Sequence, residues 1–197
     1  MDIINVNDVC LTLGKTEILK HINVSFEKGK IHGLIGRNGS GKTMLMKCIC
    51  VFIKPTSGEI IVDGKQVGKD VDFPKDMGII IETPAAAIIS DRLAPMVDFF
   101  SVGTNDLTQY TLACDRQNSK IESFCDTHHE AILRLIEMSA QNAHKNGVWI
   151  GICGELAADT TLTETFLRMG IDELSVSPGF VLKVRDKVRS IDLSKKD

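Results

Sequence analysis

The sequence lacks the features that mark membrane-spanning, secreted and nucleic-acid-binding proteins. It has no apolar run near the roughly 18 residues that a membrane-spanning helix needs, and no basic segment that leads into a shorter apolar one. The formal net charge is −3, so electrostatics give no reason to expect nucleic acid or an anionic membrane as a partner. We therefore expect a cytoplasmic protein without a membrane span.

Cysteine spacing excludes two further classes of small protein. No C-x-x-C pair or zinc-binding spacing occurs, and two of the cysteines fall within a helix-like run. We therefore expect neither a structural zinc site nor a disulfide framework. The six cysteines are Cys10, Cys48, Cys50, Cys114, Cys125 and Cys153.

The first part of the chain combines alternating strands with one helix. A chain of 197 residues suits one large or two small domains, and a 43% hydrophobic content is enough for a sizeable core. Alternation of apolar and polar residues predicts half-buried strands, and an Asp-Gly turn closes the last of them. We expect strands at 3–12, 18–26, 31–35 and 58–62, a helix at 43–52 and a loop at 64–75.

From about residue 77 the pattern changes to strands that alternate with helices, which is typical of βα units around a parallel sheet. The run at 77–81 is continuously apolar and predicts a strand buried on both faces. About four units are present, half the number in a (β/α)8 barrel. We expect strands at 77–81, 97–102, 148–153 and 173–176, and helices at 85–93, 107–115, 130–144, 160–169 and 180–191.

A glycine-rich loop stands between the predicted strand at 31–35 and the helix that follows. Residues 36–43 read GRNGSGKT, which fits the P-loop pattern G-x-x-x-x-G-K-[ST]. The glycines let backbone N–H groups surround phosphate oxygens, and the helix N-terminus adds its dipole. A strand–helix turn that binds nothing is the alternative. The candidate ligands of ATP are Gly36, Asn38, Gly39, Gly41, Lys42 and Thr43.

Residues 1 to about 84 resemble the N-terminal part of an ABC-transporter ATP-binding subunit. The resemblance rests on the P-loop and on two flanking phrases, ILKHINVSF at 18–26 and KPTSGEI at 54–60. It implies that Lys42 reaches the β- and γ-phosphates of ATP and that Thr43 offers its hydroxyl to Mg²⁺. The adenine-stacking aromatic residue usual near Leu13 is absent, as are the family's L-S-G-G-Q signature, its catalytic Asp-Glu pair and its switch histidine. Nucleotide binding is therefore expected without coupled hydrolysis.

Polar residues follow three of the predicted parallel strands. Glu82 follows the first, Asn105 and Asp106 follow the second, and Cys153 ends the third. Because the carboxyl ends of parallel strands share one edge of the sheet, these side chains are expected to converge. Two carboxylates suit Mg²⁺. Taken singly, Glu82 could cap the next helix, Asp106 could be a turn residue, and Cys153 could be a small buried hydrophobe.

Residues 77–189 resemble the C-terminal part of the barrel of phosphoenolpyruvate-utilising enzymes, of the enzyme I type in the bacterial sugar phosphotransferase system. The matching phrases are IETPAA at 81–86, DFFSVGTNDLTQYTLA at 98–113, DR at 115–116 and GICGEL at 151–156. The resemblance implies that Glu82 and Asp106 hold Mg²⁺ and that Asn105 and Arg116 contact phosphate. It also implies that Cys153 protonates C3 of the enolate as pyruvate forms.

Both resemblances are partial, so we expect a chimera of a P-loop segment at 1–76 and half of a TIM-type barrel at 77–197. The first four barrel strands and the domain with the phosphorylated histidine are missing, so the phosphotransfer cycle is not expected to close.

The histidines of the second part have simple structural interpretations. The pair His128 and His129 is most simply a polar helix start, and His144 suits a helix end. A half-barrel leaves strand edges free, which predicts a homodimer or aggregation. A non-catalytic fold with inherited motifs is the remaining alternative.

Overall fold

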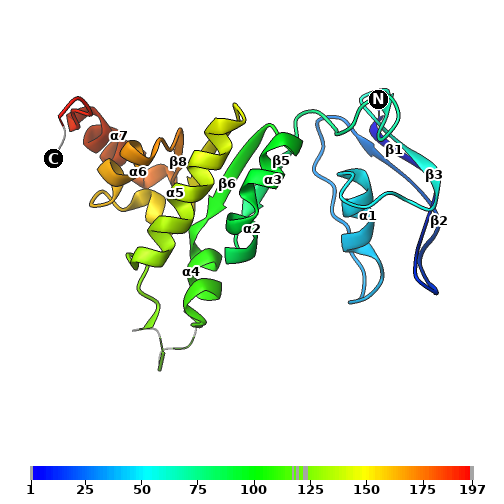
Figure 1. Cartoon of the computed structure of the whole chain (residues 1–197), viewed down its shortest axis with the longest axis horizontal. Helices are drawn as coiled ribbons and strands as arrows, with labels where there is room; N and C mark the ends of the chain where they lie inside the picture. Colours follow the sequence, from blue (N-terminus) through cyan, green and yellow to red (C-terminus); the bar gives the residue numbers. More distant parts are fainter. Residues whose placement is uncertain (1, 117, 119, 122–123, 196–197) are drawn as a thin grey trace. The chain divides into compact units, whose positions relative to one another are not determined.

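The chain folds into two compact units, residues 1–75 and residues 76–197 (Figure 1). Each unit has its own four-stranded sheet. No helix in the described part of the chain is both long enough and apolar enough to cross a membrane. Residues described by the computed structural model are 2–116, 118, 120, 121 and 124–195.

The first unit is an antiparallel sheet with strand order β2-β1-β3-β4 and one helix. The long alternating segments form a hairpin, and the Asp-Gly turn closes β3 as expected, because Asp63 and Gly64 both adopt positive φ angles of 49° and 76°. The elements are β1 (Asp2–Leu13), β2 (Thr16–Glu27), α1 (Lys42–Ile49), β3 (Ser57–Val62) and β4 (Lys65–Gln66).

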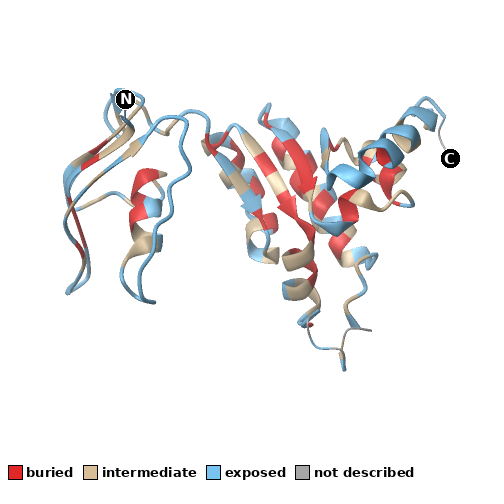
Figure 2. Ribbon diagram, turned by 180° about the vertical axis from the view of Figure 1, so that it is seen from behind, coloured by how far each residue is buried: buried red, intermediate tan, exposed pale blue. Residues whose placement is uncertain are grey.

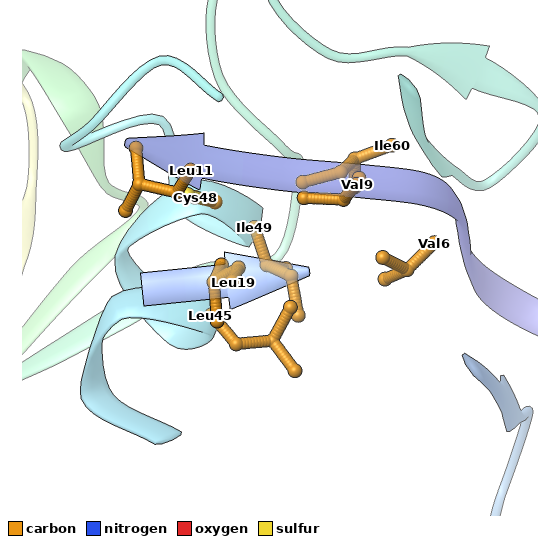
Figure 3. Packing of buried hydrophobic residues seen from close by; sticks show 8 residues of the cluster. All are labelled: Val6, Val9, Leu11, Leu19, Leu45, Cys48, Ile49 and Ile60. Atoms are coloured by element: carbon orange, nitrogen blue, oxygen red, sulfur yellow. The ribbon is translucent and has the colours of Figure 1, made fainter. Parts of the chain in front are cut away.

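The core of this unit lies between the sheet and α1 (Figure 3). Helix α1 contributes Leu45, Cys48 and Ile49, which are spaced so that they share one helix face. Burial raises the pKa of the Cys48 thiol, which keeps this small side chain neutral. Strands β1, β2 and β3 contribute Val6, Val9, Leu11, Leu19 and Ile60.

The strand predicted at 31–35 does not form. The segment is irregular, and Ile31 and Ile35 are fully exposed. An apolar run becomes a strand only when another strand supplies backbone partners. Among the described residues of this unit, the sheet consists of the four strands β2, β1, β3 and β4, and residues 31–35 pair with none of them. The glycine-rich loop therefore precedes a helix, as predicted, but follows no strand.

The second unit is a parallel sheet with strand order β5-β6-β7-β8, and helical segments connect its strands. This confirms the predicted α/β class with parallel βα units. Its strands are β5 (Gly78–Ile81), β6 (Phe99–Gly103), β7 (Trp149–Cys153) and β8 (Glu173–Ser175). Its α-helices are α2 (Pro84–Ile88), α3 (Ser90–Leu93), α4 (Thr104–Leu112), α5 (Glu130–Lys145), α6 (Thr163–Met169) and α7 (Val181–Ser190). Short 3-10 turns are η1 (Ala94–Met96), η3 (Glu155–Ala158) and η4 (Pro178–Phe180).

The two faces of the parallel sheet differ in burial. Figure 2 shows that the strands of this sheet carry both buried and less buried residues. Alternate residues point to opposite faces, and residues paired across neighbouring strands share a face. One face carries the fully buried residues Ile81, Phe100, Val102, Ile150 and Ile152, and its members at the outer strands, Ile79 and Leu174, are half-buried. The other, here called the open face, carries Ile80, Phe99, Ser101, Trp149, Cys153, Glu173 and Ser175, all exposed or half-buried.

Strand β5 is less buried than its sequence predicts. It is an edge strand with β6 as its partner, and Ile80 is exposed on the open face. A continuous apolar run indicates burial on both faces only when a second layer and a second neighbouring strand are present. Neither accompanies β5 among the described residues of this unit.

The sequence predicts no disulfide framework, but the structure contains a disulfide. Cys114 and Cys125 are joined, with their Cα atoms 5.7 Å apart. Helix α4 is followed by Ala113, whose left-handed φ of 51° turns the chain back on itself. That turn brings together two cysteines that are 11 residues apart, and their spacing alone gives no sign of it.

Candidate functional site

Glu82 leaves the carboxyl end of β5 and lies against the neighbouring strand. A Cβ atom on Gly103, the last residue of β6, would stand only 2.9 Å from Glu82 Oε1. The absence of a side chain at Gly103 therefore makes room for the carboxylate. Thr83, not Glu82, caps α2, because its hydroxyl accepts the Ala86 N–H at 3.2 Å. The carboxylate of Glu82 is thus not used as a helix cap.

Asn105 and Asp106 lie in the first turn of α4, directly after β6. The Asn105 side-chain oxygen accepts the Glu155 N–H at 3.1 Å, which ties the end of β6 to the end of β7. Asp106 Oδ1 accepts a hydrogen bond from Gln109 Nε2 at 3.1 Å. Asp106 is therefore a helical residue with one carboxylate oxygen oriented by its neighbour, and not a turn residue.

Cys153 ends β7 on the open face and is half-buried. Ser101 Oγ donates to its sulfur at 3.1 Å, and Thr104 Oγ1 donates to its backbone oxygen at 3.2 Å. The next residue, Gly154, has a φ of 107°, and a Cβ atom there would stand 2.6 Å from Thr104 Oγ1. Polar groups on β6 and α4 therefore fix the position of this thiol, which does not pack as a core hydrophobe.

Arg116 is exposed and lies beyond the C-terminus of α4. Its guanidinium Nη1 is 3.6 Å from Glu155 Oε1, and its backbone N–H donates to Gln109 Oε1 at 3.1 Å. Gln109 thus contacts both Asp106 and Arg116. The cation is held at the same edge of the sheet as Asn105, because both residues contact Glu155.

A cavity of about 460 Å³ opens beside these residues at the carboxyl ends of β7 and β8. Among its lining residues, Asp159 is the carboxylate with a perturbed pKa. Hydrogen bonds from the Thr161 hydroxyl at 2.6 Å and from the Thr161 N–H at 2.9 Å hold the pKa of Asp159 below its usual range, and His128 at 2.7 Å adds to the effect. The lining residues are Asn105, Gly154, Glu155, Ala158, Asp159, Ser175, Val176, Ser177 and Phe180.

The predicted metal ligands are two carboxylates at neighbouring strand ends. Within the described residues, no group of three or more His, Cys, Asp and Glu side chains is arranged to hold a metal ion by itself. Mg²⁺ commonly uses one or two carboxylates and completes its shell with water and substrate oxygens. The donor chemistry of Glu82 and Asp106 fits that mode of binding.

The glycine-rich loop borders a cavity of about 500 Å³ that is lined by Ile18 and residues 38–44. Gly41, with a left-handed φ of 88°, is the N-cap that directly precedes α1. The Lys42 ammonium donates to the backbone oxygens of Gly36 and Arg37 at 2.7 and 2.8 Å. The lysine therefore lies against its own loop and satisfies carbonyl groups there.

Sequence reasoning missed residues that connect the site. Ser101 could have been found from strand alternation, because it lies two residues before Gly103 on the face that also carries Cys153. Gln109 and Glu155 stand inside the matched phrases, but the contacts of Gln109 depend on the turn after α4 and those of Glu155 on how η3 lies against α4. The pair His128 and His129 was predicted to start a helix, and His129 does so by accepting the Ala131 N–H at 3.1 Å, whereas the contact of His128 with Asp159 was missed.

Comparison with known families identifies the second unit. The family model described as "PEP-utilising enzyme, PEP-binding domain" matches residues 56–193. The phosphoenolpyruvate-protein phosphotransferase of Listeria monocytogenes is 44% identical over 130 residues, which are 66% of this chain and 23% of that protein. The Enterococcus faecalis protein of the same name is 43% identical over 137 residues, which are 70% of this chain and 23% of that protein. The chain thus spans less than a quarter of the length of these relatives.

Solved structures similar to the chain are ABC-transporter ATP-binding proteins. The cbiO1 protein of Clostridium perfringens, part of the transporter complex cbiONQ, has a TM-score of 0.39 at 16% identity and covers 95% of this chain and 72% of its own. An ATP-binding cassette in its ADP conformation has a TM-score of 0.40 at 15% identity and covers 97% of this chain and 79% of its own. The N-terminal resemblance to ATP-binding subunits therefore rests on the sequence phrases around the glycine-rich loop, and not on these structural similarities.

The family model spans residues 56–193, more than half of the chain. The chain therefore belongs to the phosphoenolpyruvate-utilising enzymes and carries their phosphoenolpyruvate-binding domain.

Proposed function

We propose that the second unit binds phosphoenolpyruvate together with Mg²⁺ at the carboxyl ends of β5, β6 and β7. The observation that carries the proposal is the arrangement of three strand ends, with Glu82 against Gly103, Asn105 bonded to Glu155, and Cys153 bonded to Ser101. Family membership supports the choice of substrate. Its similarity to phosphoenolpyruvate-protein phosphotransferases supports the same reaction class.

Each residue has a role that matches its chemistry. Glu82 and Asp106 would hold the metal ion, which would stabilise negative charge on phosphate and enolate oxygens. Asn105 and Arg116 would bind and orient the phosphate, the arginine through its planar fork of donors. Cys153 would deliver a proton to C3 of the enolate, with its sulfur positioned by the Ser101 hydroxyl.

We expect binding without a complete phosphotransfer cycle. Three histidines of the second unit are engaged with neighbours: His128 contacts Asp159, His129 caps α5, and His144 contacts Asp172 at 3.0 Å. Four strands also supply only half the side chains of an eight-stranded barrel. A phosphoryl group would therefore lack an acceptor in this unit.

The test is a thermal-shift titration with phosphoenolpyruvate and MgCl₂. A ligand at 100 times its dissociation constant stabilises the folded state by about 2.7 kcal/mol, so the melting temperature of the second unit should rise. Asp106→Asn should remove the rise, whereas Asp186→Asn on the exposed surface of α7 should leave it unchanged. No shift at millimolar ligand would refute the proposal.

A second candidate function is nucleotide binding at the glycine-rich loop. It is favoured by the cavity beside residues 38–44 and by Gly41 at the start of α1. It requires Lys42 to exchange its two loop carbonyls for phosphate oxygens. The missing strand before the loop argues for weak binding, because that strand would otherwise anchor the loop.

Titration with ATP and MgCl₂ separates the two sites. Lys42→Ala should abolish an ATP-dependent shift and leave the phosphoenolpyruvate response intact, while Lys47→Ala on α1 should affect neither. If neither ligand changes the melting temperature, the remaining alternative is favoured, namely a non-catalytic chimera with inherited motifs.

A further inference from the structure

The parallel sheet has two free edges that run in the same direction. Strand β5 pairs with β6 and strand β8 pairs with β7, and no further ladder is present at either edge among the described residues of the chain. Unpaired edges expose backbone donors and acceptors, which favours pairing with another strand. Because all four strands are parallel, an added β5 could continue the sheet beyond β8 without changing its direction.

The open face exposes large side chains near the amino ends of the strands. Phe99 and Trp149 stack with their ring centroids 4.8 Å apart, and Ile80, on the same face and paired with Ser101, is 58% exposed. On the opposite face of the same strands, Ile81, Phe100, Val102, Ile150 and Ile152 are fully buried. A contiguous exposed apolar patch on an otherwise packed sheet indicates an interaction surface.

The free edge of β8 borders a groove of about 520 Å³ between this strand and the helices α6 and α7. Val181 is exposed at the start of α7 on this groove. Strand β5 has the sequence Gly-Ile-Ile-Ile, so an added copy would present isoleucines to an apolar groove. The groove is lined by Leu167, Ile171, Asp172, Glu173, Leu174, Ser175, Val176, Val181, Val184, Arg185 and Val188.

We propose that a second copy of this chain pairs its β5 with the free edge of β8, and that two such junctions close an eight-stranded parallel barrel. A two-fold axis repeats the β5–β8 contact, so both edges of both sheets are used and the assembly ends at a dimer. Eight strands enclose an interior that side chains fill, which would bury Ile80, Phe99 and Trp149 of both copies.

The dimer would also complete the candidate site. Glu82 and Cys153 stand at the carboxyl ends of their strands, so the two copies would place both sets of residues at one mouth of the barrel. Residues of the second copy would cover the open face beside Ser101 and Cys153. The proposal rests on strand edges and exposed apolar groups, and it holds whether or not phosphoenolpyruvate is the ligand.

The first test is the mass of the full chain in solution by light scattering after size exclusion. The expected mass is twice the chain mass of 21.6 kDa at tens of micromolar protein. Ile80→Lys should give a monomer, because it places a charge inside the barrel. The matched control is Ile88→Lys on α2, which is 59% exposed against 58% for Ile80, and it should stay dimeric.

A second pair of variants tests the groove. Val181→Asp should also give a monomer, while Leu182→Asp should not, because Leu182 is its exposed neighbour outside the groove lining. Circular dichroism checks that each variant is folded. A monomeric wild type, a dimer that survives both Ile80→Lys and Val181→Asp, or an open-ended series of larger species would each overturn the proposal.

Discussion

At the scale of single residues, Gly103 controls whether Glu82 can lie at the site. Its φ of −80° suits alanine, but the added Cβ would meet Glu82 Oε1 at 2.9 Å and Cγ at 2.7 Å. We expect Gly103→Ala to displace the carboxylate and abolish the melting-temperature shift from phosphoenolpyruvate and Mg²⁺. The unliganded stability should fall by less than about 1 kcal/mol, because Glu82 is exposed and can rotate away.

The control for this variant is Gly33→Ala, where an added Cβ meets no neighbour within 4 Å. It should retain the full ligand response. A Gly103→Ala protein with an unchanged response would show that the position of Glu82 is irrelevant to binding.

Asp159 should make the stability of the second unit depend on pH. Its folded-state pKa is lowered, first by the Thr161 hydroxyl. Its contribution to folding is therefore present above the unfolded pKa, about 3.9, and is lost as pH falls through the folded value. We expect Asp159→Asn to cost on the order of 1 kcal/mol at pH 7, and the difference from wild type to shrink below about pH 4. Denaturant titrations across this range measure it, and a constant difference would contradict the assignment.

Residue identities in the candidate site were largely predictable, but their contacts were not. Glu82, Asp106 and Cys153 were found because each follows an apolar strand, and parallel strands place such residues at one edge. Ser101 and Gln109 escaped notice because a serine in a strand and a glutamine in a helix are ordinary surface residues. The pairing of β6 with β7 gives Ser101 its partner Cys153, and the turn after α4 lets Gln109 contact both Asp106 and the Arg116 N–H, each at 3.1 Å.

At the scale of elements, the disulfide that follows α4 should stabilise the second unit. Closing a loop between Cys114 and Cys125 removes conformational entropy from the unfolded chain, which for this length amounts to about 2–3 kcal/mol. We expect Cys125→Ser to lower the unfolding free energy by about that amount. Dithiothreitol should lower the wild-type value similarly and leave the variant unchanged.

Intact-mass spectrometry after alkylation distinguishes the disulfide from the free thiols, because alkylation without reductant should leave Cys114 and Cys125 unlabelled. Burial raises the pKa of the Cys50 thiol and so slows its labelling, which makes denaturing conditions necessary for this count. If both cysteines label without reductant, the disulfide is absent in solution.

Element types were predictable where local pattern and tertiary partners agree. The hairpin β1–β2 and the βα units follow from alternation and helical spacing, because each buries one face against a neighbour. The segment at 31–35 has an equally good strand pattern, yet it lacks a ladder partner and stays exposed. Burial of β5 was overestimated for a similar reason, since an apolar run does not reveal whether the strand is central or at an edge.

At the scale of the whole molecule, the free edges of the second unit make its stability depend on concentration. If β5 and β8 of two copies close a barrel, unfolding is coupled to dissociation, and each tenfold rise in concentration adds about 1.4 kcal/mol per dimer. We expect the melting temperature of this unit to rise by about 2–4 °C per tenfold increase in protein concentration. Ile80→Lys should melt at a temperature independent of concentration, and Ile88→Lys should follow the wild type. A wild-type midpoint that stays constant from 1 to about 100 µM would mean that the sheet edges remain unpaired.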